Sequence, residues 1–165
     1  MFKKLIFIFI IFFGEKLCES NAMASDSVNG KTTDQVVISP NETNQIRVAV
    51  YTHLIKEIVR PKTNALLFIA ANKDELALIK TNFPNIIIEP AENREIVGHK
   101  VRDKVTKKSG IIVAVQWINI TKTSEADVHA GYFSGAGVTY DFQMYKEESV
   151  WQIRQVSGPS VFDAF

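Results

Sequence analysis

The chain has 165 residues, of which 46% are hydrophobic and 22% are charged, so it has room for one domain of ordinary size. Its 19 basic and 18 acidic residues give a formal net charge of +1, which supplies no strong positive field for a phosphate backbone. One cysteine excludes a disulfide framework and any metal site built from several cysteines. The composition therefore excludes a disordered chain and argues against a nucleic-acid partner.

The first 24 residues have the pattern of a secretory signal peptide. Lys3 and Lys4 are followed by nine apolar residues at 5–13, by Gly14, and by a small-x-small exit at 22–24. Nine residues reach only about 14 Å as a helix, too short for a bilayer core of about 30 Å. We expect cleavage after residue 24 and a periplasmic or secreted protein with no transmembrane anchor.

Cys18 offers an alternative, because a lipidated cysteine would follow the apolar run and become the first residue of the mature protein. However, a lipoprotein signal needs small or aliphatic residues directly before the cysteine, and here Glu15, Lys16 and Leu17 precede it. If cleavage follows residue 24 instead, the mature chain contains no cysteine and is formally neutral.

Residues 25–43 are mostly polar and predict a flexible arm, with one short apolar patch at 36–38 that could form an edge strand. A helix is predicted from Asn44 to Pro61, where proline ends it. Its apolar residues recur at spacings of three and four, which is typical of one buried helical stripe. They are Ile46, Val50, Tyr51, Leu54, Ile55, Ile58 and Val59.

The middle of the chain predicts a short strand–helix–strand insert, formed by a buried strand at 65–71, a helix from Asp74 to Pro84 and a strand at 86–88. Residues 91–110 carry nearly all the mid-chain charge and are expected to form an irregular connection. Within it, the lysine-rich stretch 100–108 is expected to be a solvated loop, and the alternative is a contact with an acidic partner or lipid head groups.

From residue 111 the apolar pattern changes to a period of two, which predicts four antiparallel strands joined by short turns. The predicted strands are 111–120, 126–133, 138–145 and 150–156. The sequence thus predicts an α+β fold over residues 44–156. An N-terminal helix packs on a C-terminal four-stranded antiparallel meander, with the insert between them and a C-terminal tail at 157–165. Trp151 and Ile153 are expected to face the core.

The end of the domain resembles a known group of proteins. The segment Tyr132–Tyr140 (YFSGAGVTY) and the later segment Val150–Ile153 (VWQI) are similar to small exported or lipoprotein-type α+β domains of unassigned function. The order of elements is also similar to cystatin-like and nuclear transport factor-like rolls. The resemblance implies the fold and transfers no site.

Three residues are candidates for a catalytic site: Asp127, His129 and Asp141. Asp127 and His129 lie two residues apart on one predicted strand and so share a face, and the next hairpin could bring Asp141 near His129. A carboxylate beside an imidazole is the minimum for general base chemistry, but the polar face of any half-exposed sheet would look the same. The other histidines, His53 and His99, have no ligand spacing, so no metal and no cofactor are predicted.

We therefore expect an exported, non-catalytic binding protein whose partner is another protein or a small ligand. The alternative is a small enzyme that uses His129 with Asp127 or Asp141. The sequence leaves the oligomeric state and the identity of the ligand open.

Overall fold

The structure, a computed structural model, describes residues 39–59 and 66–162, which all belong to one compact unit, Asp34–Phe165. The predicted signal peptide at 1–24, Cys18 and the apolar patch at 36–38 lie outside the described residues. The elements in chain order are α1 (Pro40–Val59), β1 (Leu66–Ile69), α2 (Lys73–Asn82), β2 (Ile87–Pro90), the 3-10 turn η1 (Ala91–Asn93), β3 (Arg94–Val97), β4 (Lys100–Asp103), β5 (Ile111–Lys122), β6 (Glu125–Phe133), β7 (Gly137–Glu147) and β8 (Val150–Phe162).

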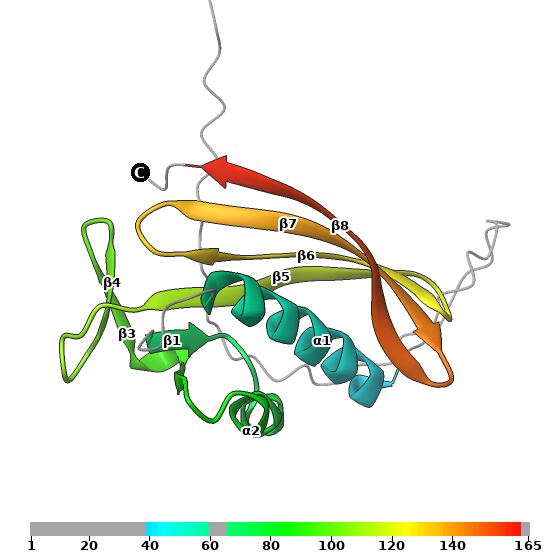
Figure 1. Cartoon of the computed structure of the whole chain (residues 1–165), viewed down its shortest axis with the longest axis horizontal. Helices are drawn as coiled ribbons and strands as arrows, with labels where there is room; N and C mark the ends of the chain where they lie inside the picture. The colour runs from blue at the N-terminus through cyan, green and yellow to red at the C-terminus, as the bar shows by residue number, and fades with distance from the viewer. Residues whose placement is uncertain (1–38, 60–65, 163–165) are drawn as a thin grey trace, which may run out of the picture. The chain divides into compact units, whose positions relative to one another are not determined.

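Six strands form one sheet in the order β2-β1-β5-β6-β7-β8 (Figure 1). Strand β1 runs parallel to both β2 and β5, whereas β5 to β8 pair antiparallel. The α+β class is confirmed, but the predicted insert does not lie apart from the sheet, because both of its strands extend it. The reason is that every residue of β1 is buried, and such a run is stable as a parallel strand covered on both faces.

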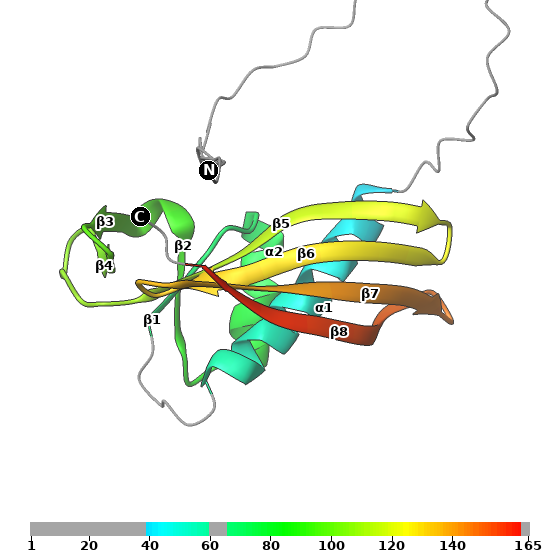
Figure 2. The same cartoon turned by 90° about the horizontal axis from the view of Figure 1, so that it is seen from above.

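Helix α1 covers one face of this sheet, which we call the inner face, and Figure 2 shows it running obliquely across β5–β8. It begins at Pro40, four residues before the predicted start. Ser39 and Glu42 form a capping box, in which each backbone N–H donates to the other's side chain at 3.3 Å, and Pro40 suits the first helical position. Among the described residues, neither helix is long and apolar enough to cross a membrane.

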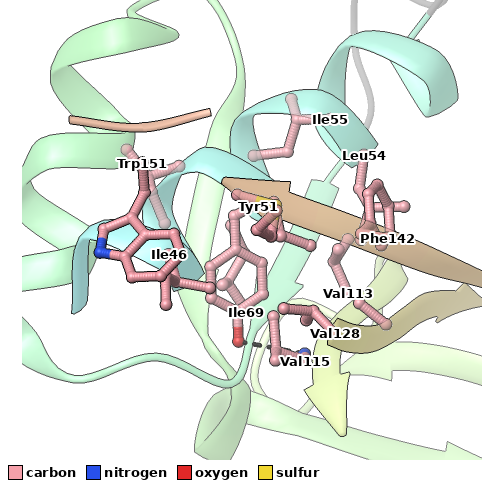
Figure 3. Packing of buried hydrophobic residues seen from close by; sticks show 14 of the residues in the cluster. Ile46, Tyr51, Leu54, Ile55, Ile69, Val113, Val115, Val128, Phe142 and Trp151 are labelled. Atoms are coloured by element: carbon pink, nitrogen blue, oxygen red, sulfur yellow. Dashed lines mark hydrogen bonds between the residues drawn. The ribbon is translucent and has the colours of Figure 1, made fainter. Parts of the chain in front are cut away.

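The core lies between α1 and the inner face (Figure 3). Five residues of the predicted helical stripe are buried in it, and Ile58 is partly buried against it; the five are Ile46, Val50, Tyr51, Leu54 and Ile55. Strands β5–β8 supply most of the opposite wall, and residues of β1, α2 and β2 complete it. Trp151 packs in this core as predicted, beside Ile46 in Figure 3. The largest fully buried side chains are Tyr51, Phe68, Phe142, Ile46, Leu54, Ile55, Leu67, Ile69, Ile79 and Met144, with Glu75 the one acidic member of the set.

Two further predictions differ from the structure. The final strand does not end at residue 156 but continues to Phe162, so most of the predicted tail belongs to β8. Pro159 does not stop it, because β8 is an edge strand and an edge strand tolerates proline. Residues 91–110 are irregular only in part: Arg94–Asp103 form a hairpin that turns at Gly98, whose φ of 60° favours glycine, whereas residues 104–110 form no strand or helix. Opposite charges face each other across this hairpin, Arg94 with Asp103 and Glu95 with Arg102.

Candidate functional site

The side of the sheet turned away from α1, which we call the outer face, carries the residues that the sequence singles out. Successive side chains of a strand point to opposite faces, so His129 lies outward where its neighbours Val128 and Ala130 are buried inward. In the strand register, four side chains form a continuous row across the sheet: Trp117 of β5, His129 of β6, Asp141 of β7 and Ser157 of β8.

His129 and Asp141 are in direct contact. The His129 Nδ1 lies 2.7 Å from the Asp141 Oδ1, a distance that is typical of a charge-assisted hydrogen bond. The Asp141 side chain is 65% exposed and the His129 side chain 23% exposed, so the imidazole is partly covered while the carboxylate stays in water. Asp141 therefore fixes the direction of the imidazole ring from an open surface.

Trp117 lies on the other side of His129. The indole and imidazole rings are stacked, with centroids 5.7 Å apart and planes inclined by 12°. Strand β1 pairs with β5 only as far as Val113, so among the described strands none lies beyond Trp117, and this residue is 48% exposed. We call these three residues the Trp117 cluster: Trp117, His129 and Asp141. The cluster presents a flat indole ring that stacks on His129 on one side and is open to solvent on the other.

A β-bulge puts Trp117 on the outer face. The register passes from the pair Val115 and Ala130 to the pair Trp117 and His129, which leaves Gln116 as the extra residue on β5. Strict alternation would place Trp117 on the buried face with Val113 and Val115, and the bulge reverses it. This is why a period of two does not reveal Trp117 as a surface residue.

Asp127 is separate from this contact. It shares the outer face with His129, but its neighbours in the register are Asn119 of β5 and Gln143 of β7. In the described part of the chain, no hydrogen bond or ion pair joins Asp127 to His129. The structure therefore brings together two of the three candidate residues, His129 and Asp141, and leaves Asp127 as a polar neighbour.

The order of the four side chains across the sheet limits the chemistry that this row could perform. A nucleophilic serine needs a histidine within hydrogen-bond reach, and Ser157 pairs instead with Asp141, on the far side from His129. What the row can supply is an oriented imidazole, an exposed carboxylate and an exposed indole. An imidazole held in this way can act as a general base or as a hydrogen-bond partner for a ligand.

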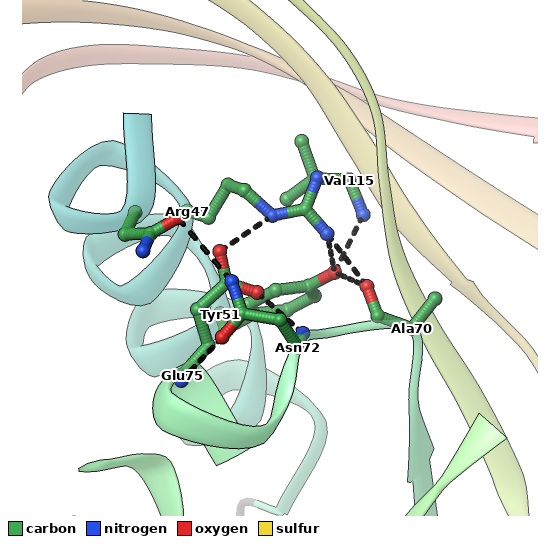
Figure 4. Close-up of polar contacts among 7 residues, drawn as sticks. Arg47, Tyr51, Ala70, Asn72, Glu75 and Val115 are labelled. Atoms are coloured by element: carbon green, nitrogen blue, oxygen red, sulfur yellow. Dashed lines mark hydrogen bonds and ion pairs between the residues drawn. The ribbon is translucent and has the colours of Figure 1, made fainter. Parts of the chain in front are cut away.

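A second polar cluster, which the sequence pattern did not lead us to expect, lies between α1 and the start of α2 (Figure 4). Glu75 is 1% exposed, and its Oε1 lies 2.9 Å from the Arg47 Nε, while its Oε2 accepts from the Asn72 backbone N–H at 2.9 Å. Arg47 and Tyr51 both donate to the carbonyl oxygen of Ala70, at 2.7 and 2.5 Å. A sequence signal was available, because Asn72 and Glu75 have the spacing of a capping box.

This buried cluster has a structural role. The Asn72 side chain accepts from the Glu75 backbone N–H at 2.9 Å, which completes the cap of α2, and the Tyr51 hydroxyl accepts from the Val115 backbone N–H at 3.4 Å. Burial raises the pKa of Tyr51, so its hydroxyl keeps its proton and donates to Ala70. The cluster ties α1, β1, α2 and β5 together, and each of its charged groups is used inside the protein.

The other two histidines lie elsewhere. His53 on α1 makes an edge-to-face contact with Phe142, with ring centroids 5.6 Å apart, and His99 follows Gly98 in the β3–β4 turn. Across residues 39–59 and 66–162, no three histidine, cysteine or carboxylate side chains are grouped so as to hold a metal ion.

Comparison with known proteins gives no match: no protein-family model, no curated protein and no solved structure is similar to this chain. The resemblance to small exported α+β domains and to cystatin-like or nuclear transport factor-like rolls therefore stays a prediction.

Proposed function

We propose that the protein is a non-catalytic binding protein of the periplasmic or secreted space, and that it contacts its partner through the Trp117 cluster. Export rests on the sequence alone, on Lys3, Lys4 and the apolar run at 5–13. Its test is the mass of the protein recovered outside the cytoplasm. A mature chain beginning at Ser25 supports the proposal, and an intact chain retained in the cytoplasm contradicts it.

The observation that carries the binding proposal is the exposed indole of Trp117. Large aromatic side chains are enriched where proteins bind, because they offer much contact area with few rotatable bonds. Here the stacked ring of His129 holds the indole in place before any partner arrives, and Asp141 holds His129 in turn. A surface ordered in this way loses little conformational entropy on binding.

The exposure of Asp141 favours binding over catalysis. Catalytic acids and bases depend on partly dry surroundings that strengthen electrostatic effects, and the carboxylate beside His129 is 65% exposed. The alternative remains a small enzyme in which His129 acts as a general base, and the 2.7 Å contact with Asp141 is the observation in its favour.

Binding is tested by capture from an envelope extract of the producing cell, with immobilised wild-type protein and two variants. Trp117→Ala removes the exposed indole, and the matched control Leu78→Ala removes an exposed apolar side chain from α2. We expect a partner that is retained by the wild type and by Leu78→Ala but lost with Trp117→Ala. Equal retention by all three proteins would overturn the role of the Trp117 cluster.

The enzymatic alternative predicts a different pattern. Any hydrolytic activity that belongs to this site disappears in His129→Ala, falls in Asp141→Asn, and survives in Trp117→Phe, which keeps an aromatic ring beside the imidazole. An activity unchanged in His129→Ala rejects the alternative, and the circular dichroism spectrum of each variant separates a loss of activity from a loss of the fold.

A further inference from the structure

We propose that residues 94–109, the β3–β4 hairpin and the loop that follows it, dock the protein onto an anionic lipid surface. We call this segment the basic hairpin. It lies on different strands from the Trp117 cluster, so the proposal goes beyond the binding function and does not depend on it.

The basic hairpin carries exposed aliphatic side chains at both of its ends. Ile96 and Val97, which are 45% and 52% exposed, precede the turn at Gly98, and Val105, which is 86% exposed, lies in the loop after β4. Of the nine large apolar side chains that are exposed in the described residues, three lie within this short segment. Ile96 and Val97 are adjacent in β3 and point to opposite faces of the hairpin, so Val97 shares its face with Lys100, and Ile96 shares its face with Val101.

Positive charge surrounds these aliphatic side chains. The segment contains six basic residues and two acidic ones, a formal net charge of +4 in a chain whose total is +1. In the register of the hairpin, Lys100 stands directly opposite Val97, and Lys104 precedes Val105 in the chain. Aliphatic groups beside lysines are the combination that binds the interface of an anionic bilayer.

Both acidic side chains of the segment are used internally. Glu95 is paired with the Lys107 ammonium at 3.0 Å, and one oxygen of Asp103 accepts from Val105 N at 3.1 Å and from Thr106 N at 2.6 Å. The hydrogen bonds from Thr106 hold the pKa of Asp103 below its ordinary value, so this acceptor stays ionised and the loop stays folded around it. Neither carboxylate therefore forms an ion pair with Lys100, Lys104 or Lys108.

Three lysines remain for an external partner. Lys100, Lys104 and Lys108 are exposed, and within the described residues their ammonium groups make no ion pair with a carboxylate. Each lysine near an anionic membrane contributes about 1 kcal/mol of attraction, which falls off within a Debye length and weakens as salt is added. Three of them, with the aliphatic side chains, give a reversible membrane contact.

The fold presents this segment at one end of the sheet, as both views show (Figures 1 and 2). Val101 packs with Leu66 and Phe68 in a small buried cluster and fixes the hairpin to β1. The backbone N–H of Gly110 donates to Val101 O at 3.0 Å, and that of Lys104 donates to Asn93 O at 2.9 Å. The aliphatic and basic groups are thus held in place before contact.

The composition favours lipid over an acidic protein. Protein interfaces are enriched in aromatic residues and arginine and depleted in lysine, whereas the exposed groups here are lysine, valine and isoleucine. Lysine acts as a point charge that suits mobile head groups, and short aliphatic side chains fit the boundary between head groups and acyl chains.

The test is co-sedimentation with vesicles of phosphatidylcholine alone and of phosphatidylcholine with one third phosphatidylglycerol, using the chain as the cell processes it. One variant, Lys100→Ser/Lys104→Ser/Lys108→Ser, removes the unpaired charge, and another, Val97→Ser/Val105→Ser, removes the aliphatic groups. The matched control, Lys56→Ser/Lys73→Ser/Lys80→Ser, removes the same charge from exposed positions on α1 and α2. All proteins share the same N-terminal residues, so any contribution from residues 1–38 is equal in all of them.

We expect binding to the anionic vesicles only, weakening with added salt. The hairpin lysine variant is expected to bind about a hundredfold more weakly, from about 1 kcal/mol for each lysine. The valine variant should lose at least tenfold, and the control and Trp117→Ala should bind like the wild type. The proposal is overturned by equal binding to both vesicles, by equal loss in the control, or by no binding to either vesicle, which is the result expected if the segment contacts an acidic protein instead.

Discussion

The two faces of strands β6 and β7 are built from alternate residues of the same chain and have opposite surroundings. Inward, Val128 and Phe142 are 0% and 1% exposed and pack with α1. On the outer face, His129 and Asp141 are partly exposed to solvent, and the ring of Trp117 stacks on His129. The comparison teaches that stability and recognition can be separated one residue at a time in these strands, because each substitution acts on one face only.

Phe142→Ala is expected to have the largest effect on stability. Phe142 is a fully buried member of the core, and truncating a buried phenylalanine costs about 3–5 kcal/mol through lost burial and the cavity that remains. Chemical denaturation measures the loss. The neighbouring control Gln143→Ala, on the outer face, should change the free energy of unfolding by less than about 0.5 kcal/mol. Similar losses in both variants would mean that the two faces are not energetically distinct.

Removing one partner of the buried ion pair is the next largest change. Arg47→Ala leaves the Glu75 carboxylate buried without its cation, at a cost of about 3 kcal/mol. By contrast, Lys107→Ala breaks the exposed pair with Glu95 and should cost less than about 1 kcal/mol. Thermal unfolding of both variants makes the comparison, and a smaller loss for Arg47→Ala would show that the buried cluster is dispensable.

Tyr51 is expected to make the inner region sensitive to alkali. Burial raises the pKa of its hydroxyl above the ordinary value, so the unfolded chain loses this proton first as the pH rises through about 10. The contribution of Tyr51 is complete below that pH and declines as the pH rises toward the pKa of the folded state. The free energy of unfolding against pH, measured for wild type and Tyr51→Phe, isolates the decline as a difference between the two curves.

At neutral pH, Tyr51→Phe should itself cost about 1–3 kcal/mol, because the Val115 backbone N–H loses its acceptor. If the two pH curves run parallel through the alkaline range, the pKa of the Tyr51 hydroxyl is not raised in the folded protein.

The smallest effect on stability is expected on the outer face. His129→Ala and Trp117→Ala should each change the free energy of unfolding by less than about 1 kcal/mol, since both side chains lie at a solvated surface. Capture of the partner should nevertheless fail with both variants. Loss of stability comparable to that of Phe142→Ala would show that the Trp117 cluster supports the fold instead of serving recognition.

The sequence allowed the local elements to be predicted better than the way in which they assemble. The buried stripe of α1 and the extended segments from residue 111 onward follow from apolar spacing, which each segment carries within itself. The position of β1 between β2 and β5 could not be derived, because a parallel partner is set by residues far along the chain. The strands of the basic hairpin could not be predicted, because few of its side chains enter a core and its sequence therefore lacks an alternating apolar pattern.

The candidate site was predicted in part for similar reasons. The approach of Asp141 to His129 follows from pairing two neighbouring strands, and the structure has it at 2.7 Å. Trp117 was not predicted to join them, because no glycine or proline marks the bulge at Gln116. The Arg47–Glu75 pair joins elements 28 residues apart and has no local periodic signal beyond the cap at Asn72.

The parallel strand β1 also bears on how the chain folds. Strands β5 to β8 meet their partners across short turns, so these hairpins can form within microseconds of collapse. Strand β1 pairs with residues 111–113, which follow it in the chain only after α2, β2 and the charged segment. Helix α1 packs on strands about a hundred residues later in the chain, as the ion pair of Glu42 with Lys146 shows, and contacts so distant in sequence form slowly. We therefore expect the ribbon of hairpins to form early, and the closure of helix over sheet to set the folding rate.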